Sequence, residues 1–170
     1  MKRKILITGV SGNLGKAVAE RYLLSGDTVI GVYSPGKTMV AGDIVPYEAN
    51  LEDEAAATTA FAKIVAEQNR LDIAILTVGG FAQGNMEDTT WSAVQRMIDL
   101  NLKTCYHMAR QAFAHMKTAG GGRIVLIGAK PALDGNEGIG LVAYVLGKSL
   151  VFKLAELLNA EGKSTILCAA

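Results

Sequence analysis

The sequence predicts an α/β fold, a doubly wound parallel sheet of the Rossmann type. Short apolar runs alternate along the chain with longer stretches that have the hydrophobic period of a helix. The short runs are apolar throughout, which is typical of strands covered by helices on both faces. Half of the residues are hydrophobic, so 170 residues can bury the core of one domain.

The predicted elements follow one another in a regular order. Strands are expected at Lys4–Thr8, Thr28–Tyr33, Asp43–Tyr47, Asp72–Val78, Arg123–Gly128 and Ser164–Ala169. Helices are expected at Leu14–Ser25, Glu52–Asn69, Thr89–Lys117 and Val142–Glu161. The third strand is the weakest prediction, because Pro46 fits only an edge, an end or a bulge.

Residues 1–170 are expected to form a single domain. Ligands of open α/β sheets bind beyond the carboxyl ends of the strands, so a segment after Ala170 would lie on the ligand side. Because the chain ends with the sixth strand, we expect the domain to be truncated there and that C-terminal segment to be absent.

Charge and cysteine content exclude several classes of function. The formal net charge is +1, which gives no electrostatic footprint for nucleic acid or an anionic membrane. Cys105 and Cys168 form no CxxC pair, and no metal site is predicted. The apolar N-terminal run is too short for a signal peptide or a membrane span. We therefore expect a cytoplasmic protein that acts on a small molecule.

A glycine-rich turn, "TGVSGNLG", directly follows the first strand. Glycines allow a tight turn and a close approach to a pyrophosphate, and the N-terminus of the following helix offers free N–H groups. The other reading is a strand-to-helix turn without a ligand. Its position between the first strand and the first helix favours dinucleotide binding. The expected contacts come from Gly9, Ser11, Gly12, Asn13, Leu14 and Gly15.

The end of the second strand is where a ribose selector is expected. NAD-binding domains place an acidic residue there, whereas this chain reads "VYSPGK". Ser34 and Lys37, a hydroxyl and a cation, suit a 2′-phosphate better than a carboxylate would. The sequence thus favours NADP(H) over NAD(H), although Ser34-Pro35-Gly36 also reads as a simple turn.

Tyr144 and Lys148 lie at positions i and i+4 of the last predicted helix, so they share one face. An ammonium group beside a phenol favours the phenolate and is expected to lower the pKa of Tyr144. Tyr144 would then serve as a general acid or base. A tyrosine and a lysine at this spacing more often only pack, but these two follow the fifth strand and so lie at the ligand end of the sheet.

The chain resembles the short-chain dehydrogenase/reductase family. The resemblance rests on "TGVSGNLG", "ILTVGG", "DLNLKT", "GGRIVLIG" and "YVLGK", in that order. It implies that Tyr144 is the catalytic acid/base and that Lys148 lowers its pKa and binds the nicotinamide ribose. It also implies roles for residues elsewhere: Asn101 would support a proton-relay water, Asn50 and Leu51 would flank the adenine, and Gly79 and Gly80 would lie beneath the cofactor. From the residues alone, Asn101 reads equally as a structural hydrogen-bonding group.

The sequence departs from the main branch of that family at the catalytic serine. Gly128 or Ala129 occupies the aligned position, and the loss of a positioned donor costs on the order of 2.7 to 4 kcal/mol. "GAKPALDG" and "TVGGFA" are similar to loops of dihydropteridine reductases, whose electron-poor acceptors need less polarisation. The resemblance thus implies an NAD(P)H-dependent reductase of a conjugated C=N or C=O acceptor, pterin-like among the options, with Tyr144 as proton donor.

Two other functions stay open on the sequence. One is an alcohol or sugar dehydrogenase that uses another donor in place of the serine. The other is a non-catalytic sensor or scaffold that binds the dinucleotide. In this family the helix over Thr89–Lys117 and the one with Tyr144 commonly form the subunit interface, so the resemblance implies a homodimer or homotetramer.

Overall fold

The computed structural model contains a six-stranded, wholly parallel sheet in the order β3-β2-β1-β4-β5-β6. It describes residues 2–37, 42–163 and 165–170, so Ser164, the first residue of the last predicted strand, lies outside them. The strands are β1 (Lys4–Thr8), β2 (Thr28–Tyr33), β3 (Ile44–Glu48), β4 (Ile73–Leu76), β5 (Gly122–Leu126) and β6 (Ile166–Ala169). The predicted fold class is confirmed.

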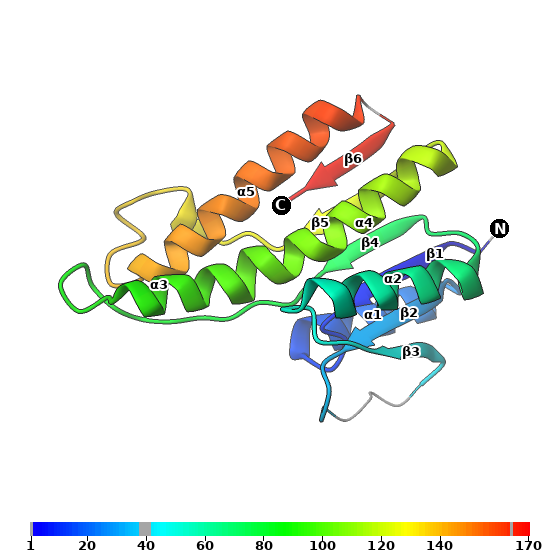
Figure 1. Cartoon of the computed structure of the whole chain (residues 1–170), viewed down its shortest axis with the longest axis horizontal. Helices are drawn as coiled ribbons and strands as arrows, with labels where there is room; N and C mark the ends of the chain where they lie inside the picture. Colours follow the sequence, from blue (N-terminus) through cyan, green and yellow to red (C-terminus); the bar gives the residue numbers. More distant parts are fainter. Residues whose placement is uncertain (1, 38–41, 164) are drawn as a thin grey trace.

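Helices cover both faces of the sheet (Figure 1). They are α1 (Asn13–Leu24), α2 (Glu54–Gln68), α3 (Trp91–Ile98), α4 (Thr104–Ala119) and α5 (Val142–Gly162), with a short 3₁₀ turn at Lys130–Ala132. Helices α2, α4 and α5 pack on one face and build the larger core around Leu6, Met108 and Ile124. Of the helices that the structure describes, α1 packs on the other face, against Ile5 and Ile7.

Strand β3 explains how a proline fits inside a strand. Pro46 lies opposite Gly31 of β2, and β3 is the outermost strand on its side. An edge strand has a neighbour on one side only, so a missing backbone donor is tolerated there. The sheet therefore keeps its third strand despite Pro46.

The long helix predicted at Thr89–Lys117 is wrong as a single α-helix. Helix α3 begins at Trp91, capped by the Thr90 hydroxyl, and a π-helical turn at Asp99–Lys103 separates it from α4. The side-chain Nδ2 of Asn101 donates to the Met97 carbonyl at 3.0 Å. The Thr104 N–H donates to the Asp99 carbonyl, five residues earlier. A side chain that competes for a helical carbonyl widens the turn, and such π-turns are frequent at functional sites.

Side-chain hydrogen bonds join β4 to β1 and α5 to β5 at the carboxyl ends of these strands. The Thr77 hydroxyl, just after β4, donates to the Thr8 carbonyl at 2.6 Å. The Lys148 ammonium donates to the Ile127 carbonyl, just after β5, also at 2.6 Å. This end of the sheet is where the predicted site residues gather. Among the described residues, none of the helices is long and apolar enough to span a bilayer.

Candidate active site

The glycine-rich turn has the geometry that the sequence predicts. Gly9 has φ +66°, and the Gly12 N–H bonds the Gly9 carbonyl at 2.9 Å. A Cβ atom at Gly15 would lie 2.3 Å from the Gly9 oxygen. Glycine is therefore required at two of the three positions, because one needs a positive φ and the other allows α1 to pack against the turn.

The N-terminus of α1 is open to solvent. Gly12 caps the helix without a side-chain hydrogen bond, while Asn13 and Leu14 are exposed and Ser11 is half-buried. Free N–H groups at a helix start attract an anion, and the absent Cβ atoms leave room for it to approach. The turn thus fits a dinucleotide pyrophosphate.

The predicted ribose selectors lie beyond the end of β2. Ser34 and Lys37 are exposed, and the Lys37 N–H bonds the Ser34 carbonyl at 3.2 Å, which makes residues 34–37 a turn. Gly36 has φ +75°, as expected in a turn, and the exposure of Ser34 and Lys37 leaves their role as ribose selectors a prediction. The next residue along the chain is outside the described part.

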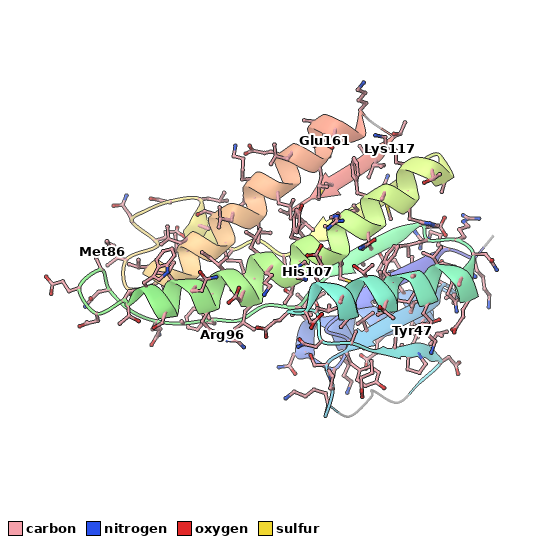
Figure 2. The ribbon with its side chains drawn as sticks, viewed as in Figure 1. Tyr47, Met86, Arg96, His107, Lys117 and Glu161 are labelled. Carbon is pink, nitrogen blue, oxygen red and sulfur yellow. The ribbon has the colours of Figure 1, made fainter. Side chains whose placement is uncertain are left out.

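The segment after β3 is held from α4. His107 is buried, and its Nδ1 lies 2.9 Å from the Leu51 carbonyl oxygen. Figure 2 shows His107 on α4, close to where α2 begins. The side chain of Leu51 is buried and Asn50 is exposed beside it. His107 therefore holds the backbone of Leu51, next to Asn50, and no periodic or motif signal in the sequence predicts that contact.

Asn101 fixes the backbone after β4. Its Oδ1 accepts the Gly80 N–H at 3.2 Å, and its Nδ2 donates to the Gly80 carbonyl at 3.1 Å. A Cβ atom at Gly79 would lie 2.7 Å from Asn101 Oδ1 and 3.5 Å from Lys148 Nζ. The amide is buried and occupied by backbone partners, so its visible role is to position the two glycines. A part in a proton relay stays a prediction.

Tyr144 and Lys148 lie in the first two turns of α5, as predicted. Lys148 is 5% exposed, and its Nζ lies 5.9 Å from the centre of the Tyr144 ring. Burial raises the pKa of the Tyr144 hydroxyl and lowers that of the Lys148 ammonium. The expected lowering of the tyrosine pKa is therefore not seen. The ammonium points at the Ile127 carbonyl, and desolvation of the half-buried phenol dominates.

At Gly128, one of the two positions aligned with the family's serine, the Phe152 ring occupies the space that a side chain would need. A Cβ atom at Gly128 would lie 2.4 Å from the Cζ atom of Phe152, a distance that side chains essentially never adopt. Ala129 is half-buried with an extended backbone and already carries a Cβ atom. Position 129 is thus the one of the two that already accommodates a Cβ atom.

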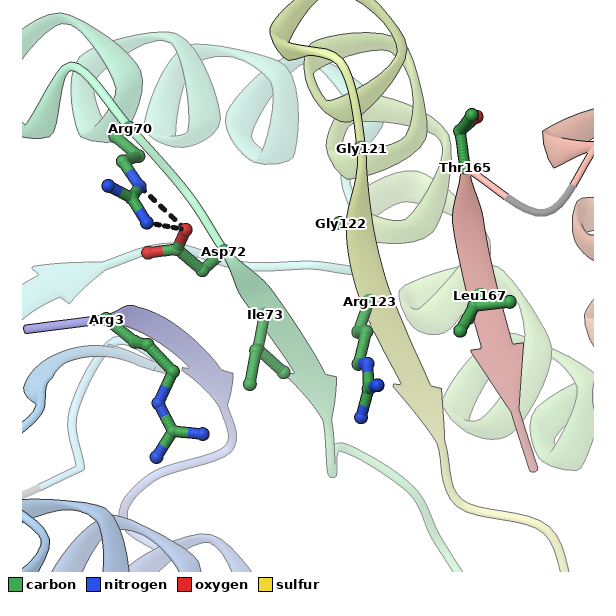
Figure 3. A pocket seen from close by; sticks show the side chains of 9 residues that line it. All are labelled: Arg3, Arg70, Asp72, Ile73, Gly121, Gly122, Arg123, Thr165 and Leu167. Atoms are coloured by element: carbon green, nitrogen blue, oxygen red, sulfur yellow. Dashed lines mark hydrogen bonds and ion pairs between the residues drawn. The ribbon is translucent and has the colours of Figure 1, made fainter. Parts of the chain in front are cut away.

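A cavity lies at the opposite end of the strands and contains none of the predicted site residues (Figure 3). Arg3, Asp72 and Arg123 line it near the amino ends of the strands, and Arg70 pairs with Asp72 at 2.6 Å. In the part of the chain that the structure describes, no group of three His, Cys, Asp or Glu side chains is placed to hold a metal. The candidate site is therefore the carboxyl edge of the sheet.

Comparison with known proteins agrees with this geometry. A family model described as short chain dehydrogenase matches residues 3–169. Elsinochrome reductase 1 of Elsinoe fawcettii is 30% identical over 73% of this chain and 49% of its own length. The acetoacetyl-CoA reductase of Acinetobacter sp. is 23% identical over 96% of this chain and 69% of its own length. The chain thus spans about half to two thirds of the length of these relatives.

Solved structures share the fold. A short-chain dehydrogenase from Streptomyces avermitilis superposes with a TM-score of 0.87 at 23% identity, covering 99% of this chain and 64% of that one. The NADPH-dependent 3-quinuclidinone reductase from Rhodotorula rubra gives 0.85 at 22% identity, covering 98% and 67%. The family model accounts for nearly every residue from the glycine turn to β6. The chain belongs to the short-chain dehydrogenase family.

Proposed function

We propose that this protein is an NAD(P)H-dependent oxidoreductase that reduces a conjugated C=N or C=O acceptor, with Tyr144 as proton donor. The observation that carries the proposal is the buried Lys148 ammonium. It is anchored to the end of β5 beside Tyr144, at the same sheet edge as the glycine turn that fits a dinucleotide. Residues 1–170 act in this proposal as one NAD(P)-binding unit.

Each residue of the site has a defined task. Gly9, Gly12 and the start of α1 hold the pyrophosphate, and Lys148 binds the ribose. The bound, reduced nicotinamide supplies the hydride. Tyr144 donates its hydroxyl proton to the heteroatom of the acceptor. Because burial raises its pKa, this hydroxyl stays protonated through neutral pH, so the proton that reduction needs is present.

The blocked position 128 supports an easily reduced acceptor. With Phe152 in that space and alanine at 129, neither aligned position supplies a hydroxyl to polarise a carbonyl. A cross-conjugated, electron-poor acceptor, for example a pterin-like compound, needs less polarisation than a simple ketone. Several relatives are named as reductases, which supports the direction of the reaction.

A turnover assay tests the proposal. For reduction, purified protein is incubated with NADPH or NADH and either a quinonoid dihydropterin or a simple ketone. For oxidation, it is incubated with NADP⁺ or NAD⁺ and a secondary alcohol. We expect substrate-dependent NAD(P)H oxidation with the conjugated acceptor to exceed that with the ketone. Faster oxidation of the alcohol would instead identify a dehydrogenase of alcohols or sugars. Tight cofactor binding without turnover of any substrate would identify a dinucleotide sensor.

The cofactor is proposed to be NADP(H), selected by Ser34 and Lys37. Lys37→Glu replaces a cation near the 2′-phosphate by an anion, so we expect the NADPH dissociation constant to rise about tenfold, on the order of 1.4 kcal/mol. The NADH constant should change less than twofold. Lys117→Glu, the same charge change at the exposed end of α4, is the control. Equal effects on both cofactors in a fluorescence titration would contradict the assignment.

A homodimer or homotetramer is proposed through α4 and α5. Tyr106 and Leu157 are 45% and 55% exposed and line a groove between these helices, and Leu150 is 40% exposed nearby on α5. Apolar area of this kind on neighbouring helices marks an interaction surface. Leu157→Glu is expected to yield monomers in light scattering after size exclusion. Leu24→Glu, at an 83% exposed leucine of α1, should leave the assembly unchanged.

The proposed location is the cytoplasm. Cys105 and Cys168 are both free, which agrees with a reducing compartment.

A further inference from the structure

Phe81 packs beside Tyr144 and is largely exposed to solvent. The centres of the two rings are 5.0 Å apart, and their planes meet at 68°. Phe81 is 60% exposed, whereas Tyr144 is half-buried. The rings therefore form a corner, with the phenylalanine as its solvent-facing wall and the tyrosine hydroxyl as its polar element.

The backbone that carries Phe81 is held on both sides. Asn101 binds the N–H and the carbonyl of Gly80, and a Cβ atom at Gly80 would lie 2.5 Å from the Leu100 side chain. Further along, the Gly84 N–H bonds the Gly140 carbonyl at 2.8 Å, and the Val142 N–H bonds the Gly84 carbonyl at 3.1 Å. A large apolar ring is thus presented to solvent from a fixed segment.

Exposed apolar side chains flank the same loops. Ile139 and Met86 are each 79% exposed, one beside Gly140 and the other at the outer end of the loop after Gly84, where Figure 2 labels Met86. Flat aromatic rings stack best on an exposed ring face, and such contacts are worth more than their buried area alone. An aliphatic chain gains no such face-to-face contact.

We propose that Phe81 is a specificity-determining residue that selects planar, conjugated substrates by stacking. A flat acceptor lying against the Phe81 ring would turn one edge toward Tyr144, so that its C=O or C=N heteroatom meets the hydroxyl. This assignment rests on the proposed function and names the substrate class of the same site. A conjugated acceptor is already favoured because its C=O or C=N bond needs less polarisation than that of a simple ketone. Stacking on Phe81 would favour it further.

The test compares two acceptors in the same variants. Turnover with NADPH is measured on 9,10-phenanthrenequinone, which is planar, and on 2,3-butanedione, which is small and aliphatic. Phe81→Leu should lower kcat/KM for the quinone about tenfold and change that for the diketone less than twofold. Phe81→Tyr keeps the ring and should keep both values within about twofold. Trp91→Leu, at a 72% exposed aromatic residue of α3, is the matched control.

A binding measurement separates this inference from the proposed function. If the wild type binds NADPH but turns over neither these two acceptors nor the quinonoid dihydropterin, the proposed function fails. Calorimetric titration of the protein–NADP⁺ complex with the quinone then decides the role of Phe81. Binding about tenfold weaker in Phe81→Leu than in Phe81→Tyr supports stacking. Equal binding, or an equal loss of turnover on quinone and diketone, overturns it, because Phe81 would then act only by supporting the Tyr144 ring.

Discussion

Replacing Tyr144 by phenylalanine is expected to abolish acceptor reduction while NADPH and NADH bind within about twofold of the wild type. The substitution removes one hydroxyl from a half-buried ring and leaves its packing against Phe81 in place. Loss of the proton donor alone typically costs 10²- to 10⁴-fold in rate. Tyr22→Phe, at a half-buried tyrosine of α1, removes the same atom away from the site and from the proposed subunit interface and should leave turnover unchanged.

The pH profile gives a second readout of the same group. Because burial raises the pKa of Tyr144, its protonated form persists above the ordinary value of about 10. Reduction, which needs the proton, should therefore stay flat through neutral pH and fall only in strong alkali. Oxidation of the product needs the phenolate and should rise with pH. Turnover retained in Tyr144→Phe, or reduction that falls between pH 7 and pH 8, would contradict the role of Tyr144 as donor.

The fold was predictable because its signals are local. Apolar runs, the glycine spacing and the helix periods each depend on residues close together in the sequence, and the observed elements match them with boundaries shifted by a few residues. Pro46 restricted its strand to an edge, an end or a bulge, and the structure places β3 at an edge. The π-helical turn was not predictable, since it depends on a competition between the Asn101 amide and a backbone N–H for one carbonyl.

The sequence indicated which residues form the candidate site, but not the contacts that they make. Tyr144, Lys148 and Asn101 were identified from spacing and resemblance, and the structure brings them to one edge. The direction of the tyrosine pKa was missed because it depends on where the Lys148 ammonium points and on how far the phenol is desolvated. The ring of Phe152 in the serine space is a contact between distant segments, and one sequence carries no signal for it.

Restoring a serine at the two aligned positions is expected to give opposite results. Gly128→Ser places a Cβ atom 2.4 Å from the Phe152 ring, so either the ring or α5 must move. Overpacking of this kind costs about 1–3 kcal/mol. Urea unfolding should show that loss of stability. Ala129→Ser adds only an oxygen atom to an existing Cβ and should unfold within about 0.5 kcal/mol of the wild type.

The two variants also separate stability from chemistry. If the missing donor is what restricts the enzyme to conjugated acceptors, Ala129→Ser should raise kcat/KM for a simple ketone by up to about 10²-fold, approaching the worth of one positioned donor. Activity on a conjugated acceptor should change little, because that acceptor needs less polarisation.

We expect the Phe152 ring to account for the stability cost of Gly128→Ser, and a double variant tests this. Phe152→Leu removes the ring that occupies the serine space, so Gly128→Ser should cost less stability in that background than in the wild type. The difference between the two costs measures the steric conflict directly. Equal costs would mean that the penalty arises from the backbone of residue 128. The absence of a side chain there would then be a property of the strand end rather than of α5 packing against it.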